Sequence, residues 1–261
     1  MTAARLPSDS VSTTLNSAYQ VLREADPSQN SGRREVVFID TSLVDWEVLA
    51  KGVRLGVEVV LLDGSQDGLA QMAAWAEGKS GYDAIHLLSH GAVGQVRLGT
   101  ATLDNAALSA RAAELTALGA ALTEAGDVLL YGCNVAAGQA GVDFVQKLAR
   151  ATGADVAASE DATGAANKGG DWFLESATGL IGQPSIEEKE YDGVLPATTL
   201  SAGDIAVVGM NADSGTYAQY WAFVPLVNIG SGTVIHFTDV GIDTNGAFIT
   251  VNATEYHLTW R

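Results

Sequence analysis

The sequence contains a single cysteine, Cys133, and few basic residues, and each scarcity excludes a class of protein. One cysteine excludes an internal disulfide framework, and the Cys/His spacing of a zinc site is absent. There are 14 Lys and Arg against 31 Asp and Glu, which gives a formal net charge of −17. With no basic cluster, nucleic acid and anionic membranes are poor partners. The N-terminus lacks the apolar core of a signal peptide, and no apolar run approaches a membrane span, so we expect no membrane insertion.

What the sequence does have is an apolar content of 47% over 261 residues, enough to bury a core. Apolar, β-branched runs alternate with segments of helical spacing, which predicts an α/β fold with a mainly parallel sheet and helices on both faces. The expected strands are residues 35–40, 57–62, 83–89, 127–131 and 155–158, with shorter strands at 172–175 and 180–181. The expected helices are residues 42–51, 68–78, 105–124 and 139–152, and a small hairpin should follow Gly91.

Composition divides the chain into three parts. Residues 1–33 are rich in Ser, Thr, Asn and Asp and predict a flexible leader, with a short helix allowed near residues 16–24. Residues 34–195 carry the β-α alternation. Residues 196–261 begin with a linker and continue as alternating β-rich segments, which predicts the N-terminal part of a β-sandwich domain.

Two apolar runs end in residues capable of nucleophilic chemistry. Residues 82–91 read Y-D-A-I-H-L-L-S-H-G, and residues 127–137 read D-V-L-L-Y-G-C-N-V-A-A. His90 and Cys133 therefore follow the C-terminal ends of buried strands, the edge where open α/β sheets bind ligands. A histidine beside a cysteine can form a thiolate–imidazole pair. The alternative for Cys133 is a small buried hydrophobe, and His86 is best interpreted as a histidine of the sheet core.

These motifs resemble a known family. S-H-G and Y-G-C at two strand ends resemble the His-Gly and Cys motifs of caspase-like cysteine peptidases, the group of caspases, legumain, gingipains and separase. The stretches G-C-N-V-A-A-G-Q-A-G, T-G-A-D-V-A-A-S-E-D-A-T-G and G-G-D-W-F-L-E resemble a caspase-like domain of unknown function, number 4347, of large bacterial adhesin-like surface proteins. The likeness covers roughly residues 35–182. The β segment that follows resembles a lamin-tail-like module.

The resemblance implies a caspase-like three-layer sandwich and assigns catalytic roles. Cys133 would be the nucleophile, and His90 the general base or the proton donor to the leaving amine. The backbone N–H of Gly91, with that of Cys133, would form the oxyanion hole. The sequence departs from the wider group at Gly132, where alanine is common.

The resemblance also implies where a substrate side chain would bind. Peptidases of this type form the P1 pocket, which holds the side chain before the scissile bond, at positions matching Asp40, Ser159, Glu160 and Asp161. Three carboxylates there would favour Arg or Lys. Lys168 and Lys189 then become candidate self-cleavage points.

The expected function is therefore a cysteine endopeptidase that acts on a peptide or protein substrate, with a basic P1 preference, and processes its own precursor or a bacterial surface protein. Partners would include the downstream domains of a longer precursor. The resemblance implies an extracellular or cell-surface location reached without an N-terminal signal, with the cytoplasm as the alternative. No cofactor or metal is required. Calcium remains an option at four acidic residues, Asp204, Asp213, Asp239 and Asp243.

Two rival functions remain open. The first is a non-catalytic caspase-like scaffold domain in a large secreted adhesin, which thiol reactivity would distinguish from a peptidase. The second is a flavodoxin-like or other doubly wound binding protein. Against the second, no strand is followed by a glycine-rich phosphate loop.

Overall fold

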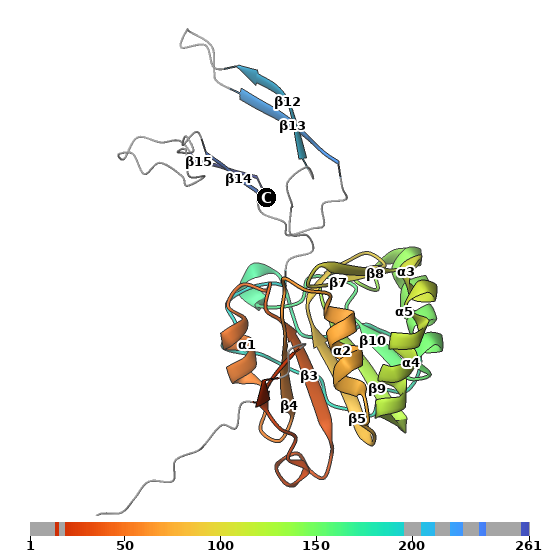
Figure 1. Cartoon of the computed structure of the whole chain (residues 1–261). Coiled ribbons are helices and arrows are strands. Elements are labelled where there is room, and N and C mark those ends of the chain that lie inside the picture. Colours follow the sequence, from red (N-terminus) through yellow and green to blue (C-terminus); the bar gives the residue numbers. More distant parts are fainter. Residues whose placement is uncertain are drawn as a thin grey trace, which may run out of the picture. The chain divides into compact units, whose positions relative to one another are not determined.

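The chain forms two units, Met1–Thr198 and Thr199–Arg261 (Figure 1). In the second unit, β12 (Ile205–Asn211) pairs antiparallel with β13 (Tyr220–Pro225). Likewise β14 (Ile235–Thr238) pairs antiparallel with β15 (His257–Trp260). The β-rich character predicted for this part is confirmed, and the sandwich remains a prediction. The computed structural model describes residues 14–15, 19–195, 205–211, 220–226, 235–238 and 257–260.

The first unit is built on one sheet of eight strands in the order β1-β2-β4-β3-β5-β9-β10-β11. The five inner strands β4, β3, β5, β9 and β10 are parallel, and β2 and β11 pair antiparallel to them on either side. The predicted α/β fold with a mainly parallel sheet is thereby confirmed. The strands are β1 (Thr14–Leu15), β2 (Gln20–Arg23), β3 (Glu35–Asp40), β4 (Glu58–Leu62), β5 (Tyr82–Leu88), β9 (Leu122–Tyr131), β10 (Asp155–Ala158) and β11 (Ser176–Ala177).

The helices cover both faces of the sheet. Val36 and Phe38 of β3 face α2, α4 and α5, whereas Val37 and Ile39 face α1 and the chain that follows β11 (Figure 1). This alternation follows from the two-residue period of a strand. In the described residues, no helix is long and apolar enough to cross a membrane. The helices are α1 (Trp46–Gly52), α2 (Gly68–Ala76), α3 (Ala107–Ala110), α4 (Ala112–Ala121) and α5 (Gly138–Thr152), with 3₁₀ turns at Pro27–Gln29 and Ala166–Lys168.

The part of the predicted leader closest to the domain belongs to the sheet. Gln20–Arg23 is strand β2, paired with β4, so the helix expected near residues 16–24 is wrong. Val21 is buried in the core, and the Arg23 guanidinium donates to the backbone oxygens of Val57 and Arg54 at 2.9 and 2.7 Å. A four-residue strand has too little periodicity to be recognised without its partner, which comes from a distant part of the chain.

Two further element predictions differ from the structure. The long helix expected over residues 105–124 is divided at Arg111 into α3 and α4. The strands expected at residues 172–175 and 180–181 are wrong, because only Ser176–Ala177 pairs with β10. Trp172 contributes a side chain to the core instead of a strand to the sheet.

The predicted hairpin after β5 is confirmed as a three-stranded antiparallel sheet. It consists of β6 (His90–Ala92), β7 (Gln95–Leu98) and β8 (Ala101–Asp104). The turn between β6 and β7 contains Gly94, whose φ of 70° lies in the left-handed region that glycine adopts without strain. His90 is the first residue of β6 and pairs with Arg97, so this small sheet holds its backbone just after the end of β5.

Candidate active site

The chain brings His90 and Cys133 to one edge of the sheet. Strands β5 and β9 are parallel neighbours, and Leu88 lies opposite Tyr131 at their C-terminal ends. The Ser89 N–H donates to the Tyr131 carbonyl oxygen at 3.1 Å, which continues the pairing one residue further. His90 and Cys133 follow directly, so their predicted position beyond two neighbouring strand ends is confirmed.

Two glycines let these strand ends touch. A Cβ atom on Gly91 would lie 2.7 Å from the Gly132 carbonyl carbon and 2.9 Å from the Cys133 oxygen. A Cβ atom on Gly132 would lie 3.0 Å from the Ser89 oxygen and 3.2 Å from the Gly91 nitrogen. A methyl group at either position would push the strand ends apart. This contact gives a physical reason for glycine, in place of alanine, before the cysteine in this chain.

The Cys133 thiol is buried, with 1% of the residue exposed, and its hydrogen-bond partners are backbone groups. The thiol donates to the carbonyl oxygen of Leu195, and the Thr163 N–H donates to Sγ at 3.3 Å. Burial raises the pKa of the Cys133 thiol to about 11, which the negative charge of Asp161 reinforces and the N–H of Thr163 opposes. In this state the sulfur is protonated and held in an apolar cluster with Tyr131 and Trp172.

The imidazole of His90 is also buried and faces the loop after β3. Its Nε2 lies 3.4 Å from the Ser42 carbonyl oxygen, and 2% of the residue is exposed. Within the part of the chain that the structure describes, the Cys133 thiol bonds to Thr163 and Leu195, and not to His90. The fold therefore brings both residues to one edge without a hydrogen bond between them in this state.

A peptide segment of the same chain covers the thiol. Residues 193–195 run antiparallel to residues 163–165, with Gly164 opposite Val194. The Leu195 N–H donates to the Thr163 oxygen at 2.8 Å. The Ala165 N–H donates to the Gly193 oxygen at 2.7 Å. This short ladder is what carries the Leu195 carbonyl to Cys133.

Two of the residues expected in the P1 pocket are buried and already bonded. Asp40, at the end of β3, accepts the Ser42 N–H on Oδ1 at 2.8 Å and the Gly99 N–H on Oδ2 at 2.6 Å. Ser159 follows β10 and donates from Oγ to the Asp161 carbonyl oxygen at 3.1 Å. Asp40 thus joins the loop after β3 to the hairpin, since each of its oxygens accepts a backbone N–H.

The other two expected pocket residues, Glu160 and Asp161, are exposed. The Glu160 N–H donates to Glu175 Oε2 at 2.8 Å. Oxygens of Asp161, Asp171 and Glu175 lie within 4.8 Å of one another, and carboxylates so arranged suit a hard cation such as calcium. The pKa of the Asp161 carboxyl is raised, first by partial desolvation and then by the negative charges of Glu175 and Asp171. Asp161 is thus grouped with these residues and not with Asp40. The residues considered for calcium lie outside the described part: Asp204, Asp213, Asp239 and Asp243.

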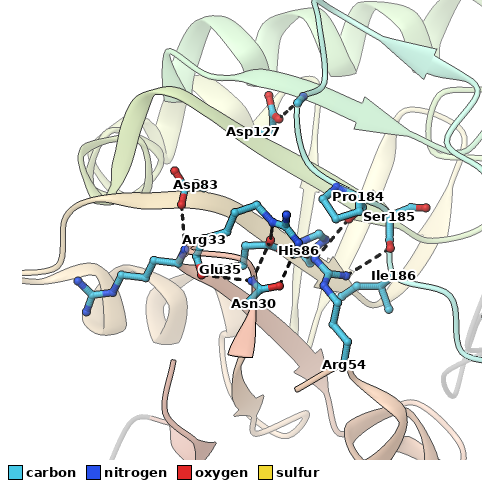
Figure 2. Close-up of polar contacts among 12 residues, drawn as sticks. Asn30, Arg33, Glu35, Arg54, Asp83, His86, Asp127, Pro184, Ser185 and Ile186 are labelled. Atoms are coloured by element: carbon cyan, nitrogen blue, oxygen red, sulfur yellow. Dashed lines mark hydrogen bonds and ion pairs between the residues drawn. The ribbon is translucent and has the colours of Figure 1, made fainter. Parts of the chain in front are cut away.

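A second buried polar cluster, away from the thiol, escaped sequence reasoning. Figure 2 shows Glu35 of β3 surrounded by Asn30, Arg33, Arg54 and His86. Its carboxylate pairs with the guanidinium groups of Arg33, at 2.7 Å from Nε, and of Arg54. It also lies 2.9 Å from His86 Nε2 and accepts a hydrogen bond from Asn30 Nδ2 at 3.0 Å. Burial alone would raise the pKa of Glu35, but His86, Arg33 and Arg54 outweigh it and lower the pKa to about 2. His86 belongs to the sheet core, as interpreted from the sequence.

Residues 182–195, which we call the closing segment, run along the α1 face of the sheet. The Ile186 N–H donates to the Tyr131 hydroxyl at 2.7 Å, and the Gly182 N–H to Asp127 Oδ2 at 2.8 Å. Figure 2 shows the start of this segment beside Arg54. A charged run such as residues 187–190 is typical of a solvated linker; residues 187 and 190 are exposed, but Glu188 is 2% exposed. Burial raises the pKa of Glu188 to about 7, against the opposing charges of nearby arginines.

The α/β unit defines the class of this chain. Residues 36–195 match the family described as domain of unknown function DUF4347, and the chain belongs to this family. The matched region begins in β3 and ends at Leu195, so it contains the inner strands, both strand-end motifs and the closing segment. Comparison with curated proteins gives no match, and comparison with solved structures gives none either.

Proposed function

We propose that this chain is a cysteine endopeptidase of caspase-like type that acts on peptides or proteins through Cys133 and His90. One observation carries the proposal: a peptide carbonyl, that of Leu195, is bound on the Cys133 thiol at the sheet edge that also carries His90. A nucleophile, a base and an extended peptide at one strand edge are the parts that acyl transfer needs. The caspase-like three-layer topology belongs to the same proposal.

The proposed reaction divides into two steps. His90 takes the proton of the Cys133 thiol, and the thiolate attacks the carbonyl carbon of the substrate. The N–H groups of Gly91 and Cys133 stabilise the resulting oxyanion, and His90 then protonates the leaving amine as the C–N bond breaks. Water, deprotonated by His90, hydrolyses the thioester and restores the thiol. For this to happen, the imidazole must turn from Ser42 toward the sulfur once substrate is bound.

A second function, a non-catalytic scaffold domain in a large secreted adhesin, is favoured by a different observation. The thiol is buried, burial raises its pKa to about 11, and its hydrogen-bond partners are backbone groups of Thr163 and Leu195. These are properties of an inert structural cysteine. In that case the closing segment would simply complete the apolar layer on the α1 face.

The biological role is part of the proposal. The peptidase would process its own precursor or a partner protein on a bacterial surface, outside the cell. Action in the cytoplasm is the alternative. The low cysteine content and the strongly acidic charge of −17 are compatible with either location.

The test is cleavage of a mixed peptide library, with product ends identified by mass spectrometry. Because Leu195 covers the thiol, the full chain is compared with its Leu195→Asp variant, each also carrying Cys133→Ser or His90→Ala. We expect cleavage in at least one background and its loss, by about 10³-fold or more, in both site variants. Folded protein that cleaves nothing in either background would refute the peptidase and favour the scaffold.

A further inference from the structure

The surface beside the thiol is shaped to take an extended peptide. Gly164 has a φ of 139° and lies against the closing segment: a Cβ atom there would be 2.3 Å from the Gly193 oxygen and 2.6 Å from the Val194 Cα. Only glycine lets two backbones approach so closely. Residues 163–165 therefore form a docking edge for a strand, and strand addition uses main-chain hydrogen bonds that any peptide can make.

The register on this edge selects Leu195 as the residue at the reactive position. Its carbonyl oxygen accepts from the Cys133 thiol, and its side chain is fully buried in an apolar cluster with Tyr131, Trp172 and Tyr191. By contrast, the side chains of Lys168 and Lys189, expected as self-cleavage points, are 49% and 81% exposed. The residue whose carbonyl contacts the thiol is therefore a leucine, and its side chain fills an apolar pocket.

The bound carbonyl is in a resting arrangement. The thiol donates its proton to the carbonyl oxygen, whereas cleavage requires a thiolate directed at the carbonyl carbon. The next residue in the sequence is Pro196, so the bond beyond Leu195 is a tertiary amide whose nitrogen carries no hydrogen. An extended peptide held in this way occupies the site without being consumed.

We propose that residues 193–195 act as a built-in competitive inhibitor of the Cys133 site, and that this site binds extended peptides with a leucine-like side chain at the position of Leu195. The inference rests on the proposed function of the site in binding peptides. It differs from the expected basic P1 preference: both carboxylate oxygens of Asp40 already accept backbone N–H groups, and the side chain at the reactive position is a buried leucine. Opening the segment is then the event that activates the site.

The polar contacts made by Asp192, just before the ladder, lie at the surface. Lys168 Nζ donates to the backbone carbonyl oxygen of Asp192 at 2.6 Å, and Asn167 Nδ2 donates to Asp192 Oδ1 at 3.0 Å. Both contacts are exposed. Surface contacts of this kind contribute little. Residues 193–195 are held by the two backbone bonds, the thiol contact and the buried Leu195 side chain, all of which a peptide in solution can reproduce, and the buried Tyr191 anchors the chain just before them.

The experiment measures alkylation of Cys133 by iodoacetamide, followed by intact mass, in the full chain. We expect Leu195→Asp and the milder Leu195→Ala to be labelled at least about tenfold faster than the wild type, because the thiol regains solvent and thiolate character. Leu180→Asp is the matched control, since Leu180 is 89% exposed, and should label like the wild type. A cooperative urea transition identifies the variants that remain folded.

The second part of the experiment adds peptides to the opened variants. N-acetyl-Asp-Gly-Val-Leu-amide, which copies residues 192–195, should slow labelling toward the wild-type rate, and N-acetyl-Asp-Gly-Val-Arg-amide should protect less. If folded Leu195→Ala is labelled at the wild-type rate, the proposal that residues 193–195 inhibit the site is wrong. If the arginine peptide protects as well as the leucine peptide, the site has no preference for a leucine-like side chain. If the wild type releases a fragment beginning at residue 196, residues 193–195 are a substrate of the site and not an inhibitor.

These outcomes are separable from failure of the peptidase. Labelling and peptide protection need binding alone, so protection without hydrolysis of any peptide supports the docked segment and refutes catalysis. Cys133-dependent hydrolysis that is equally fast in the wild type and in Leu195→Asp supports catalysis and refutes inhibition.

Discussion

Removing the charge of Glu35 should destabilise the domain in a pH-dependent way. The carboxylate is fully buried among Arg33, Arg54, His86 and Asn30 (Figure 2), and its pKa is about 2, compared with an ordinary value of 4.5. A difference of this size corresponds to at most about 3 kcal/mol of folding free energy. The two arginine side chains are 31% and 28% exposed, so solvent screening reduces the figure to about 2 kcal/mol.

The sign follows from the direction of the shift. Because the folded-state pKa lies below the unfolded value, the stabilisation is fully present above about pH 4.5 and is lost as pH falls toward 2. The variant Glu35→Gln keeps the size of the side chain and removes the charge. At pH 7 it should therefore unfold with a free energy lower by about 2 kcal/mol, and this gap should shrink to about half or less near pH 3.

Urea denaturation, followed by tryptophan fluorescence at several pH values, measures both quantities. Glu124→Gln is the matched control, because Glu124 is exposed and its substitution should change stability by less than about 0.5 kcal/mol. If the two variants unfold at the same urea concentration at pH 7, the Glu35 network does not stabilise the fold. A gap that stays constant down to pH 3 would also contradict the reasoning, since the charge would then not be its source.

Four further predictions concern the site and the closing segment. Alkylation of Cys133 in the folded chain should be about 100-fold slower at pH 7.5 than in the urea-unfolded chain, because burial raises its pKa to about 11 from 9.0; rates within tenfold of each other would contradict this. Glu188→Gln should increase stability at pH 8 but not at pH 4, because the pKa raised from 4.5 to about 7 makes the folded state lose stability as pH rises from about 4.5 to about 7; equal effects at both pH values would exclude this cause. Tyr131→Phe, which leaves the Ile186 N–H without its acceptor, should cost about 1 to 3 kcal/mol and increase hydrogen exchange at that amide, and unchanged exchange would show that the bond is dispensable. Gly91→Ala should cost about 1 to 3 kcal/mol in thermal or urea unfolding, because its methyl group meets the Gly132 and Cys133 backbone; full stability would mean that the strand ends can separate.

Patterns in consecutive residues were sufficient to predict the main strands of the α/β unit and their order along the chain. Residues 35–40 and 155–158 were predicted as strands with the bounds that β3 and β10 have. The apolar runs before His90 and Cys133 also predicted that both residues follow parallel strands. These predictions succeed because strand and helix periods are written in consecutive residues, and because β-α alternation leaves few topologies open.

Predictions failed where an element is defined by a distant partner. Strand β2 has four residues and exists through its pairing with β4. Glu188, in a charged stretch that indicates a solvated linker, is buried on the α1 face. Nothing near Glu35 in the apolar run E-V-V-F-I-D indicates that Arg54 pairs with its charge or that His86 lies within hydrogen-bond distance of it. A pattern of neighbours cannot reveal contacts between residues far apart in the sequence.

The sequence by itself determined the β-α order and the presence of a histidine and a cysteine at two strand ends. Only the tertiary structure decided what surrounds the thiol. The fold brings Leu195 onto the edge at Thr163 and the sulfur into an apolar cluster, and that environment, more than the residue type, sets the protonation and accessibility of Cys133. The physical reason is that desolvation depends on every group packed around an atom, and those groups come from separate segments of the chain.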